Sequence, residues 1–428
     1  MIWIVILSGL ILIGLTGIPI GIGLGLMGLF ILHYLVGDAT LLAITSVWNT
    51  FNDFVLSAVP LFIFMGEILL RSGVSKRLYL AVAPFFRTIP GGLLHTNIAV
   101  CTMFGAISGT STATAAAIGS VAYPELKRRG YDRTMVVGTL AAGGTLGLLI
   151  PPSLTLLLYG ATQGVSIGQL FAAGILPGLL IALGFMAVIY VMARRNPSIA
   201  PADEVKLPVK EVVLGVLRVW PVAVLIFAVL GTIYLGIATA TEAAGLGVIA
   251  SIIVGFTWGD LTLKNLVSAF RDGMVVFATL GVVLIGALIL AQSMSAMALP
   301  SQVMSLLNGM DTSPYMILFL VIALYLVLGC FFDGISLLLM TVPVVFPVLT
   351  GVGFDPVWVG VIVTICIEIG MLTPPVGMNL FVLVAITRGE VNLVQAAKGT
   401  VPFWILMLVA LLVLTMFPEI VLVLPSFV

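Results

Sequence analysis

Long apolar stretches recur along the whole chain and are separated by short polar segments. Several of them reach the roughly 20 residues that an α-helix needs to cross a bilayer. This pattern predicts an all-α polytopic membrane protein without a soluble domain, whose first apolar stretch is retained rather than cleaved as a signal. The expected spans lie near residues 2–18, 20–36, 54–70, 135–163, 170–193, 216–235, 241–258, 273–295, 357–386 and 402–425.

The basic residues divide the connections into two groups. All 17 Lys and Arg residues fall in five segments, which the positive-inside rule assigns to the cytoplasm. These segments are 71–87, 127–133, 194–218, 264–271 and 388–398. The connections without a basic residue are expected outside, as are both termini. These connections are 37–53, 164–168, 235–239, 296–314 and 351–356.

Two apolar segments begin and end on the same predicted side. Residues 94–123 lie between cytoplasmic segments, and residues 315–350 lie between outside connections. The first segment is too short for two full spans. Because each segment begins and ends on the same predicted side, we expect a re-entrant helical hairpin in both. Non-helical backbone at membrane depth is tolerated only where it is buried or lines a wet cavity. The hairpins therefore suggest a translocation site.

An internal repeat accompanies the hairpins. The string LIPPS from Leu149 pairs with LTPPV from Leu372, and a shift of 225 residues superposes Ser111 on Ser336. Proline removes a backbone donor, so each double proline should break its helix, near 135–163 and 357–386. Because the charge pattern gives the halves opposite orientations, we expect two inverted-topology repeats, 1–195 and 216–428, joined by a cytoplasmic linker at 196–215.

The first hairpin tip, FGAISGTSTATAAAIG, is rich in small hydroxyl residues. Hydroxyl and carbonyl oxygens suit a hard cation such as sodium, although the same composition also suits close packing between helices. The corresponding string GCFFDGIS carries Asp333, and a carboxylate at membrane depth is costly and points to function. Glu242 and Glu368 are also embedded in apolar sequence. Each could bind a cation, relay a proton or pair with a polar neighbour.

Composition and motifs exclude several other classes. The net charge is zero, 61% of residues are hydrophobic and 8% are charged, which does not favour nucleic acid as a partner. The three cysteines lack CxxC spacing, the two histidines cannot form HExxH, and no Walker lysine occurs. Ser108 lacks a plausible general base for an intramembrane protease. Transport without an ATP site must use an ion gradient or a partner.

The strings ISGTSTATAAAIGS, LLIPPS, ATEAAG, GCFFDGIS and EIGMLTPPVGMN resemble the large, DctM-like membrane subunit of TRAP (tripartite ATP-independent periplasmic) transporters. The resemblance covers essentially the whole chain. It implies an elevator-type carrier in the lipid of the bacterial inner membrane, with two sodium sites near the hairpin tips and uptake of carboxylate-bearing solutes. It also implies two partners, a small four-helix membrane subunit on a separate chain and a periplasmic substrate-binding protein.

The resemblance further implies which residues form the sites. The first sodium site would use Ser108, Gly109, Ser111, Thr112, Thr145, Gly147 and Pro151. The second sodium site would use Asp333, Gly334, Ser336, Thr373, Gly377 and Asn379. Substrate would bind between the tips, near Thr110, Ser153, Ile335 and Met378.

Three alternatives stay open on the sequence. The nearest is a stand-alone ion-coupled carboxylate carrier or antiporter of the same fold. A passive anion channel is more distant, and it stays open because channel and carrier sites share their chemistry. An intramembrane enzyme is the most remote. The substrate also stays open among C4-dicarboxylates, sialic acids and keto acids, since no basic residue lies in the predicted membrane core.

Overall fold

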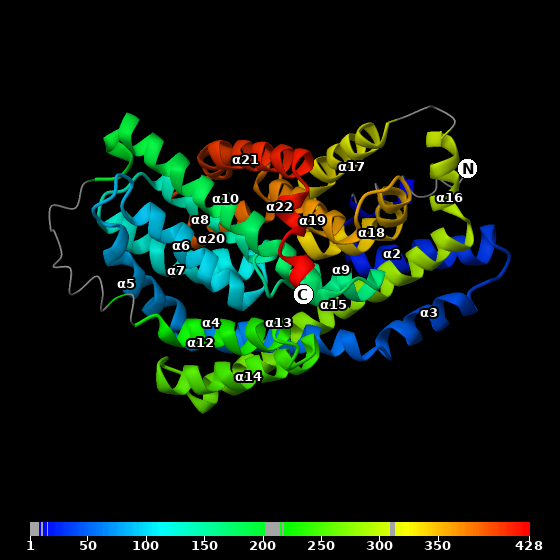
Figure 1. Cartoon of the computed structure of the whole chain (residues 1–428), viewed down its shortest axis with the longest axis horizontal. Helices are drawn as coiled ribbons and strands as arrows, with labels where there is room; N and C mark the ends of the chain where they lie inside the picture. Colours follow the sequence, from blue (N-terminus) through cyan, green and yellow to red (C-terminus); the bar gives the residue numbers. More distant parts are fainter. Residues whose placement is uncertain (1–7, 10–11, 15, 202–214, 216–217, 309–312) are drawn as a thin grey trace.

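The computed structural model describes residues 8–9, 12–14, 16–201, 215, 218–308 and 313–428. All regular elements in this part of the chain are helices, as predicted (Figure 1). Seven of the described helical segments are long and apolar enough to cross a membrane. They are Phe54–Arg71, Arg133–Gln163, Ile167–Arg195, Ala240–Thr257, Leu263–Ala296, Gly334–Gly351 and Leu393–Met416.

A helical hairpin and an interrupted helix are present in the first half. Helices α6 (Leu93–Ser108) and α7 (Ser111–Arg128) form the hairpin, with a tip at Gly109 and Thr110. Helix α8 (Arg133–Leu149) then stops at a cis Pro151–Pro152 bond, and α9 (Leu154–Gln163) continues beyond it. The long helix α10 (Ile167–Arg195) follows.

The second half contains the same order of elements. Helices α17 (Pro314–Gly329) and α18 (Gly334–Gly351) form the second hairpin. Helix α19 (Pro356–Leu372) is interrupted by a cis Pro374–Pro375 bond before α20 (Met378–Ile386), and the long helix α21 (Leu393–Met416) comes last. The double prolines therefore break both helices, as predicted, while the opposite orientation of the halves stays a prediction.

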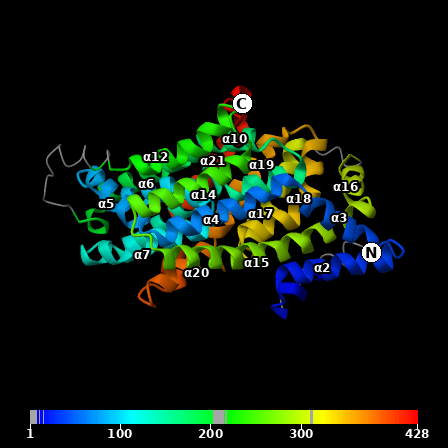
Figure 2. The same cartoon turned by 90° about the horizontal axis from the view of Figure 1, so that it is seen from below.

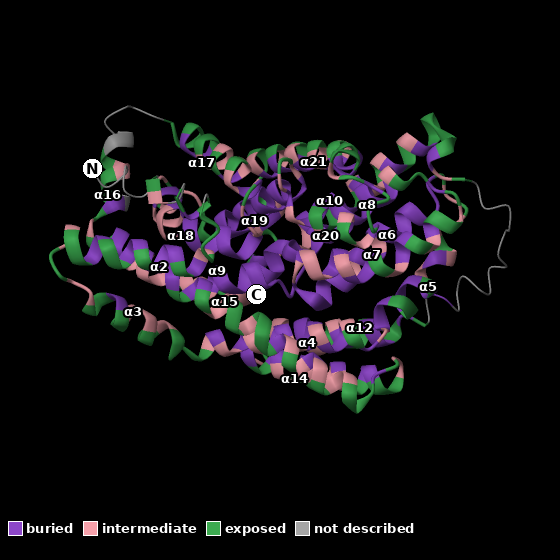
Figure 3. Cartoon of the chain, turned by 180° about the vertical axis from the view of Figure 1, so that it is seen from behind, coloured by how far each residue is buried: buried purple, intermediate pink, exposed green. Residues whose placement is uncertain are grey.

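The two sets of helices exchange contacts. Half-helix α20 packs against α7, and half-helix α9 packs against α18, so each break lies beside the hairpin of the other half. The long helices exchange too, because α21 packs on α8 and α10 packs on α19. Glycines permit the closest approaches: a Cβ at Gly399 of α21 would lie 3.3 Å from Gly138 Cα of α8. Figure 3 shows the buried residues concentrated around α8, α9 and α19.

The remaining long helices lie outside this core. Helix α15 (Leu263–Ala296) runs along nearly the full length of the molecule (Figure 2). It packs on α2 (Ile20–Phe30) and on α4 (Ala58–Arg71). A π-helical turn extends α2 to Leu35. Helix α14 (Ala240–Thr257) packs on α4. Helix α12 (Trp220–Ile226) begins the helical segment that precedes α14 in the chain. Many apolar side chains of α14 and α15 are exposed, as expected of lipid-facing helices.

Several connections are more helical than expected. The connection 37–53 contains α3 (Leu41–Phe51), the connection 296–314 contains α16 (Leu299–Asn308), and the basic segment 71–87 contains α5 (Val74–Phe86). These helices are shorter than a span, so a search for apolar stretches of spanning length misses them. Helix α15 also begins ten residues before its expected start at 273, because basic side chains are tolerated on a helix end that leaves the membrane.

Two predicted segments are only partly covered. The span near 2–18 and the linker 196–215 lie largely outside the described residues. The last expected span, 402–425, ends as a long helix at Met416 and continues as the short helix α22 (Glu419–Leu422) after Pro418. Proline cannot donate to the previous turn, which explains the interruption.

Candidate functional site

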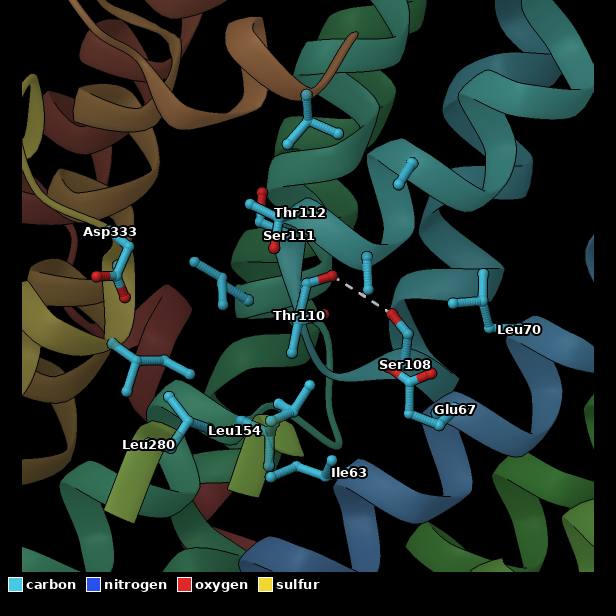
Figure 4. A pocket seen from close by; sticks show the side chains of 18 of the residues that line it. Ile63, Glu67, Leu70, Ser108, Thr110, Ser111, Thr112, Leu154, Leu280 and Asp333 are labelled. Atoms are coloured by element: carbon cyan, nitrogen blue, oxygen red, sulfur yellow. Dashed lines mark hydrogen bonds between the residues drawn. The ribbon is translucent and has the colours of Figure 1, made fainter. Parts of the chain in front are cut away.

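A cavity of about 460 Å³ lies where the two hairpin tips meet. The first tip contributes Ser108, Thr110, Ser111 and Thr112, and the second contributes Asp333 with its two following residues (Figure 4). The other walls come from the two prolyl breaks and from α4 and α15. Their lining residues include Leu148, Leu154, Met371, Val382, Ile63, Gly66, Glu67, Leu70, Val276 and Leu280.

Hydroxyl groups and one glycine shape the first tip. Ser108 Oγ lies 2.6 Å from Thr114 Oγ1, which donates to the Thr110 carbonyl at 2.7 Å. Gly109 has φ +65°, the left-handed region that favours glycine, and a Cβ there would lie 2.9 Å from the Pro152 carbonyl oxygen. The Leu154 amide also donates to the Gly109 carbonyl at 3.1 Å. The tip is therefore seated directly on the first prolyl break.

The first break places bare backbone beside the tip. A Cβ at Gly147 would lie 2.7 Å from the Thr110 carbonyl oxygen, so only glycine allows this approach. The Thr145 hydroxyl donates back to the Ala142 carbonyl at 2.7 Å. Ser153 is buried and caps α9 by accepting from the Leu156 amide at 3.3 Å. The structure thus brings Gly109 and Thr110 of the tip to Gly147 and Pro152 of the break, whereas the Thr145 hydroxyl is bonded within its own helix. The first sodium site itself stays a prediction.

The second tip and break are joined in a similar way. Asp333 is the N-cap of α18 and accepts from the Ser336 amide at 3.1 Å. The Gly377 amide, after the second break, donates to the Cys330 carbonyl at 3.3 Å, and Gly377 has φ +54°. The Thr373 hydroxyl donates to the Ile369 carbonyl at 2.7 Å. The second tip is therefore held against the second break through Cys330 and Gly377, and a Cβ at Gly334 would lie 3.3 Å from Met371 Sδ. The assignment of Asp333, Gly334 and Ser336 to one sodium site stays a prediction.

Asn379 connects the second half to the first tip. It is fully buried in the first turn of α20, and its amide donates to Ser111 Oγ at 2.6 Å and to the Ala141 carbonyl at 3.4 Å. Its Oδ1 has no hydrogen-bond partner among the described residues. The family resemblance assigns Asn379 to the second sodium site, but the structure places its side chain beside residues assigned to the first.

The four residues that were expected to bind substrate do not all lie at the cavity. Thr110 and Ile335 line the cavity, and Thr110 Oγ1 is buried without a hydrogen-bond partner in the part of the chain that is described. Ser153 is buried behind the first tip, and Met378 is half-buried at the start of α20, away from the cavity lining. Thr110 and Ile335 are therefore the best placed of the four.

The two embedded glutamates differ. Glu242 is exposed and forms a capping box with Thr239 at the start of α14, so the structure does not bring it to the cavity. Glu368 is fully buried in α19, and neither carboxyl oxygen has a hydrogen-bond partner within the described ranges.

Glu67 is a cavity residue that the sequence analysis did not identify. It lines the hairpin-tip cavity, while the neighbouring Arg71 pairs with Asp272. The signal was available in the sequence, because Ile63, Gly66, Glu67 and Leu70 follow the i, i+3, i+4, i+7 spacing of one helix face.

The donors around the cavity are oxygen atoms. No cluster of three or more His, Cys, Asp or Glu side chains suited to a transition metal occurs among the described residues. A cation between the tips would be held by carbonyl and hydroxyl oxygens and by the Asp333 carboxylate, which are ligands typical of hard ions. None of the described residues that line the cavity is Lys, Arg or His.

Comparison with known proteins agrees with this architecture. Residues 7–420 match the family described as "Tripartite ATP-independent periplasmic transporter, DctM component". The chain is 32% identical to the C4-dicarboxylate TRAP transporter large permease protein DctM of Pseudomonas aeruginosa, over 94% of this chain and 93% of the relative. It is 33% identical to the isethionate TRAP transporter permease protein DctMQ of Oleidesulfovibrio alaskensis, over 95% of this chain and 63% of that relative.

A solved structure supports the fold. The YdaH transporter of Alcanivorax borkumensis superposes with a TM-score of 0.65 at 16% identity, covering 90% of each chain. At this identity the likeness concerns the fold alone. Together with the match along nearly the whole sequence, these findings show that the chain belongs to the DctM family of TRAP transporter large permeases.

Proposed function

We propose that the protein performs sodium-coupled uptake of a small organic anion across the inner membrane, as the large permease of a binding-protein-dependent TRAP system. The anion would be a C4-dicarboxylate, a sialic acid or a similar small acid. Two relatives of nearly equal identity are named for a C4-dicarboxylate and for isethionate, so identity at this level does not select the acid.

One observation carries the proposal. The two hairpin tips bring hydroxyls, broken-helix carbonyls and Asp333 to one cavity, and no basic residue is among the described residues that line it. An anion inside the membrane needs compensation for its charge, because an unpaired charge in a low-dielectric medium is very costly. A cation held by these oxygens supplies it. Binding of sodium and binding of the anion then favour each other, which is the thermodynamic basis of coupling.

The donors fit sodium at two places. The first place is the Ser108–Thr112 tip with Gly147 and Pro151, and the second is Asp333, Gly334 and Ser336 with Gly377. Thr110 Oγ1 and Asn379 Oδ1 are buried and have no hydrogen-bond partner among the described residues, so they are free to act as ligands near the first place. Buried polar atoms without partners are rare in folded proteins, so such atoms suit a site that is completed by an ion.

The packing suggests how the site moves. The hairpins and interrupted helices hold one another through exchanged contacts, and we propose that they cross the bilayer as one transport domain. Helices α2, α4, α14 and α15 would form the scaffold. We also propose that a small membrane subunit attaches to the scaffold and that a periplasmic binding protein delivers the substrate.

Reconstitution into liposomes tests the proposal. Uptake should require an inward sodium gradient and the binding protein, and Asp333→Ala should abolish it while the protein stays folded. A stand-alone carrier would transport without the binding protein. A passive channel would give conductance in a planar bilayer without saturable dependence on sodium. Normal sodium-dependent uptake by Asp333→Ala would contradict the role given to this carboxylate.

A further inference from the structure

A second, polar cavity lies apart from the hairpin tips. Its volume is about 240 Å³, and α3, α9, α15 and α18 form its walls. Five of its lining residues are polar and none is charged, which is unusual in a chain that is 61% hydrophobic. The polar residues are Ser46, Thr162, Gln163, Gln292 and Ser295.

A cavity of about 220 Å³, lined mostly by apolar side chains together with Asp53 and Ser57, lies between the two. It shares Leu280 with the hairpin-tip cavity, and it shares Leu284 and Leu339 with the polar cavity. The three cavities therefore form a row along α15. Leu280 and Gln292 are about 18 Å apart along the helix axis at 1.5 Å per residue. Leu280 and Leu284 come from α15, which we place in the scaffold, and Leu339 comes from α18 of the proposed transport domain.

The packing of α15 against α2 sets the direction in which the polar face of α15 points. Gly286 lies against α2, where its Cα is 3.5 Å from a Cβ placed on Gly25. This close contact leaves Leu284, Gln292 and Ser295 facing α3, α9 and α18. The polar side chains are therefore held at a protein-lined cavity, and polar groups at such a place imply water or a polar ligand.

The amide groups can bind an acid weakly. Gln292 has no hydrogen-bond partner in the described part of the chain, and the Gln163 amide nitrogen donates only to Thr162 Oγ1, at 3.2 Å. Amide N–H and hydroxyl groups donate to carboxylate or sulfonate oxygens. Without a fixed positive charge these groups bind the acid with modest affinity, which suits a site that must release its ligand to a second site.

The polar cavity lies near the connections that are predicted to be outside the cell membrane. Helices α3, α9 and α15 lie in or end at 37–53, 164–168 and 296–314, connections without Lys or Arg, whereas α5 belongs to the basic segment 71–87. Figure 1 shows α3 and α16 at one end and α5 at the opposite end. By the positive-inside rule the polar cavity belongs to the periplasmic side.

We propose that this cavity is a vestibule, a low-affinity site that receives the organic anion before it reaches the hairpin tips. Leu280, Leu284 and Leu339 form an apolar barrier between the two sites. The proposal rests on the proposed transport of an organic anion, and it adds a second binding site on the outer part of the same route.

Thiol labelling tests the vestibule without measuring uptake. In right-side-out vesicles, with Cys330→Ala as background, we compare the modification of Gln292→Cys by anionic sulfonatoethyl and cationic trimethylammonium-ethyl methanethiosulfonates. Thr279→Cys, on an exposed part of α15, is the lipid-facing control, and Gln302→Cys, exposed on α16, is the water-facing reference. Cys101 and Cys366 are 0% and 1% exposed and stay in place, whereas Cys330 is 8% exposed and lies at the second hairpin tip.

We expect Gln292→Cys to react much faster than Thr279→Cys, with an anionic-to-cationic rate ratio at least equal to that of Gln302→Cys. A rate as low as that of Thr279→Cys, or a ratio tenfold below the reference, would overturn the vestibule. Sodium-driven uptake and its loss in Asp333→Ala, measured in the same vesicles, report separately on the proposed function.

Kinetics provide the second measurement. The double variant Gln163→Leu, Gln292→Leu should raise the KM for the solute delivered by the binding protein by about tenfold with little change in maximal rate, because two modest hydrogen bonds are lost. Gln302→Leu is the matched control and should leave KM unchanged. An unchanged KM in the double variant would overturn the binding role of the two amides.

Discussion

The Asn379 amide donates a hydrogen bond of 2.6 Å to Ser111 Oγ, across 268 positions of sequence. The bond ties the half-helix after the second prolyl break to the tip of the first hairpin. Both side chains are buried, so water does not compete for it. The bond therefore couples the position of α20, in the second half, to that of the first hairpin tip.

Replacing either partner should show this link. Asn379→Ala and Ser111→Ala should each lower the free energy of unfolding by about 1–3 kcal/mol, because each leaves a buried polar group unsatisfied. The double variant should lose less than the sum, with a coupling energy of about 1 kcal/mol. Unfolding in detergent measures all three variants. Additive losses would show that the two side chains do not interact in the folded protein.

Asp333 can be tested with two substitutions that separate charge from capping. Asparagine caps helices about as well as aspartate, whereas alanine costs about 1 kcal/mol at an N-cap. We expect Asp333→Asn to keep the thermal stability of the sodium-free protein and Asp333→Ala to lower it. Both should lose the stabilisation that sodium gives, measured as the rise in Tm with added sodium chloride relative to potassium chloride. A full sodium response in Asp333→Asn would show that the charge is not needed.

The hairpins and broken helices were predictable because their signals are local. Charge placement predicted that 94–123 returns to the side on which it began, and a double proline interrupts a helix in either half. The Asn379–Ser111 contact was not predictable, since the register between helices distant in sequence is set by tertiary packing. Glu242 shows a missed local signal: Thr239 and Glu242 have the T-x-x-E spacing of a capping box, which explains this carboxylate without a site.

Close helix packing at the first hairpin gives a prediction about glycine. A Cβ at Gly105 of α6 would lie 2.7 Å from Gly147 Cα, so Gly105→Ala must push the hairpin away from α8. Overpacking of this kind costs about 1–3 kcal/mol. A Cβ at Gly281 of α15 would meet no other atom within 4 Å, so Gly281→Ala is the matched control and should be neutral or stabilising. Equal Tm values for the two variants would contradict this packing.

A charge cluster at the predicted cytoplasmic side gives a pH dependence. Hydrogen bonds from Lys127 and Tyr123 hold the pKa of Glu390 below its ordinary value, and Arg133 lies 3.6 Å away. The stability from this carboxylate is fully present above the unfolded pKa of about 4.3 and is lost as pH falls through the lower folded pKa. The Tm of Glu390→Gln should therefore lie below that of the native protein at pH 7, and the two should converge in acid. A constant difference down to pH 3 would exclude ionisation of Glu390 as its cause.

Glu368 provides the last prediction, because its buried carboxyl group has no partner among the described residues. An ionised carboxylate in such surroundings costs far more than the neutral acid, and glutamine closely matches the shape of the neutral acid. We expect Glu368→Gln to keep both Tm and sodium-driven uptake, and Glu368→Ala to lose about 2–4 kcal/mol of stability through the cavity it leaves. Unfolding in detergent and uptake in liposomes measure the two effects. If Glu368→Gln folds normally but stops net uptake while still exchanging substrate, the carboxyl group must release its proton during the cycle, and a purely structural role is excluded.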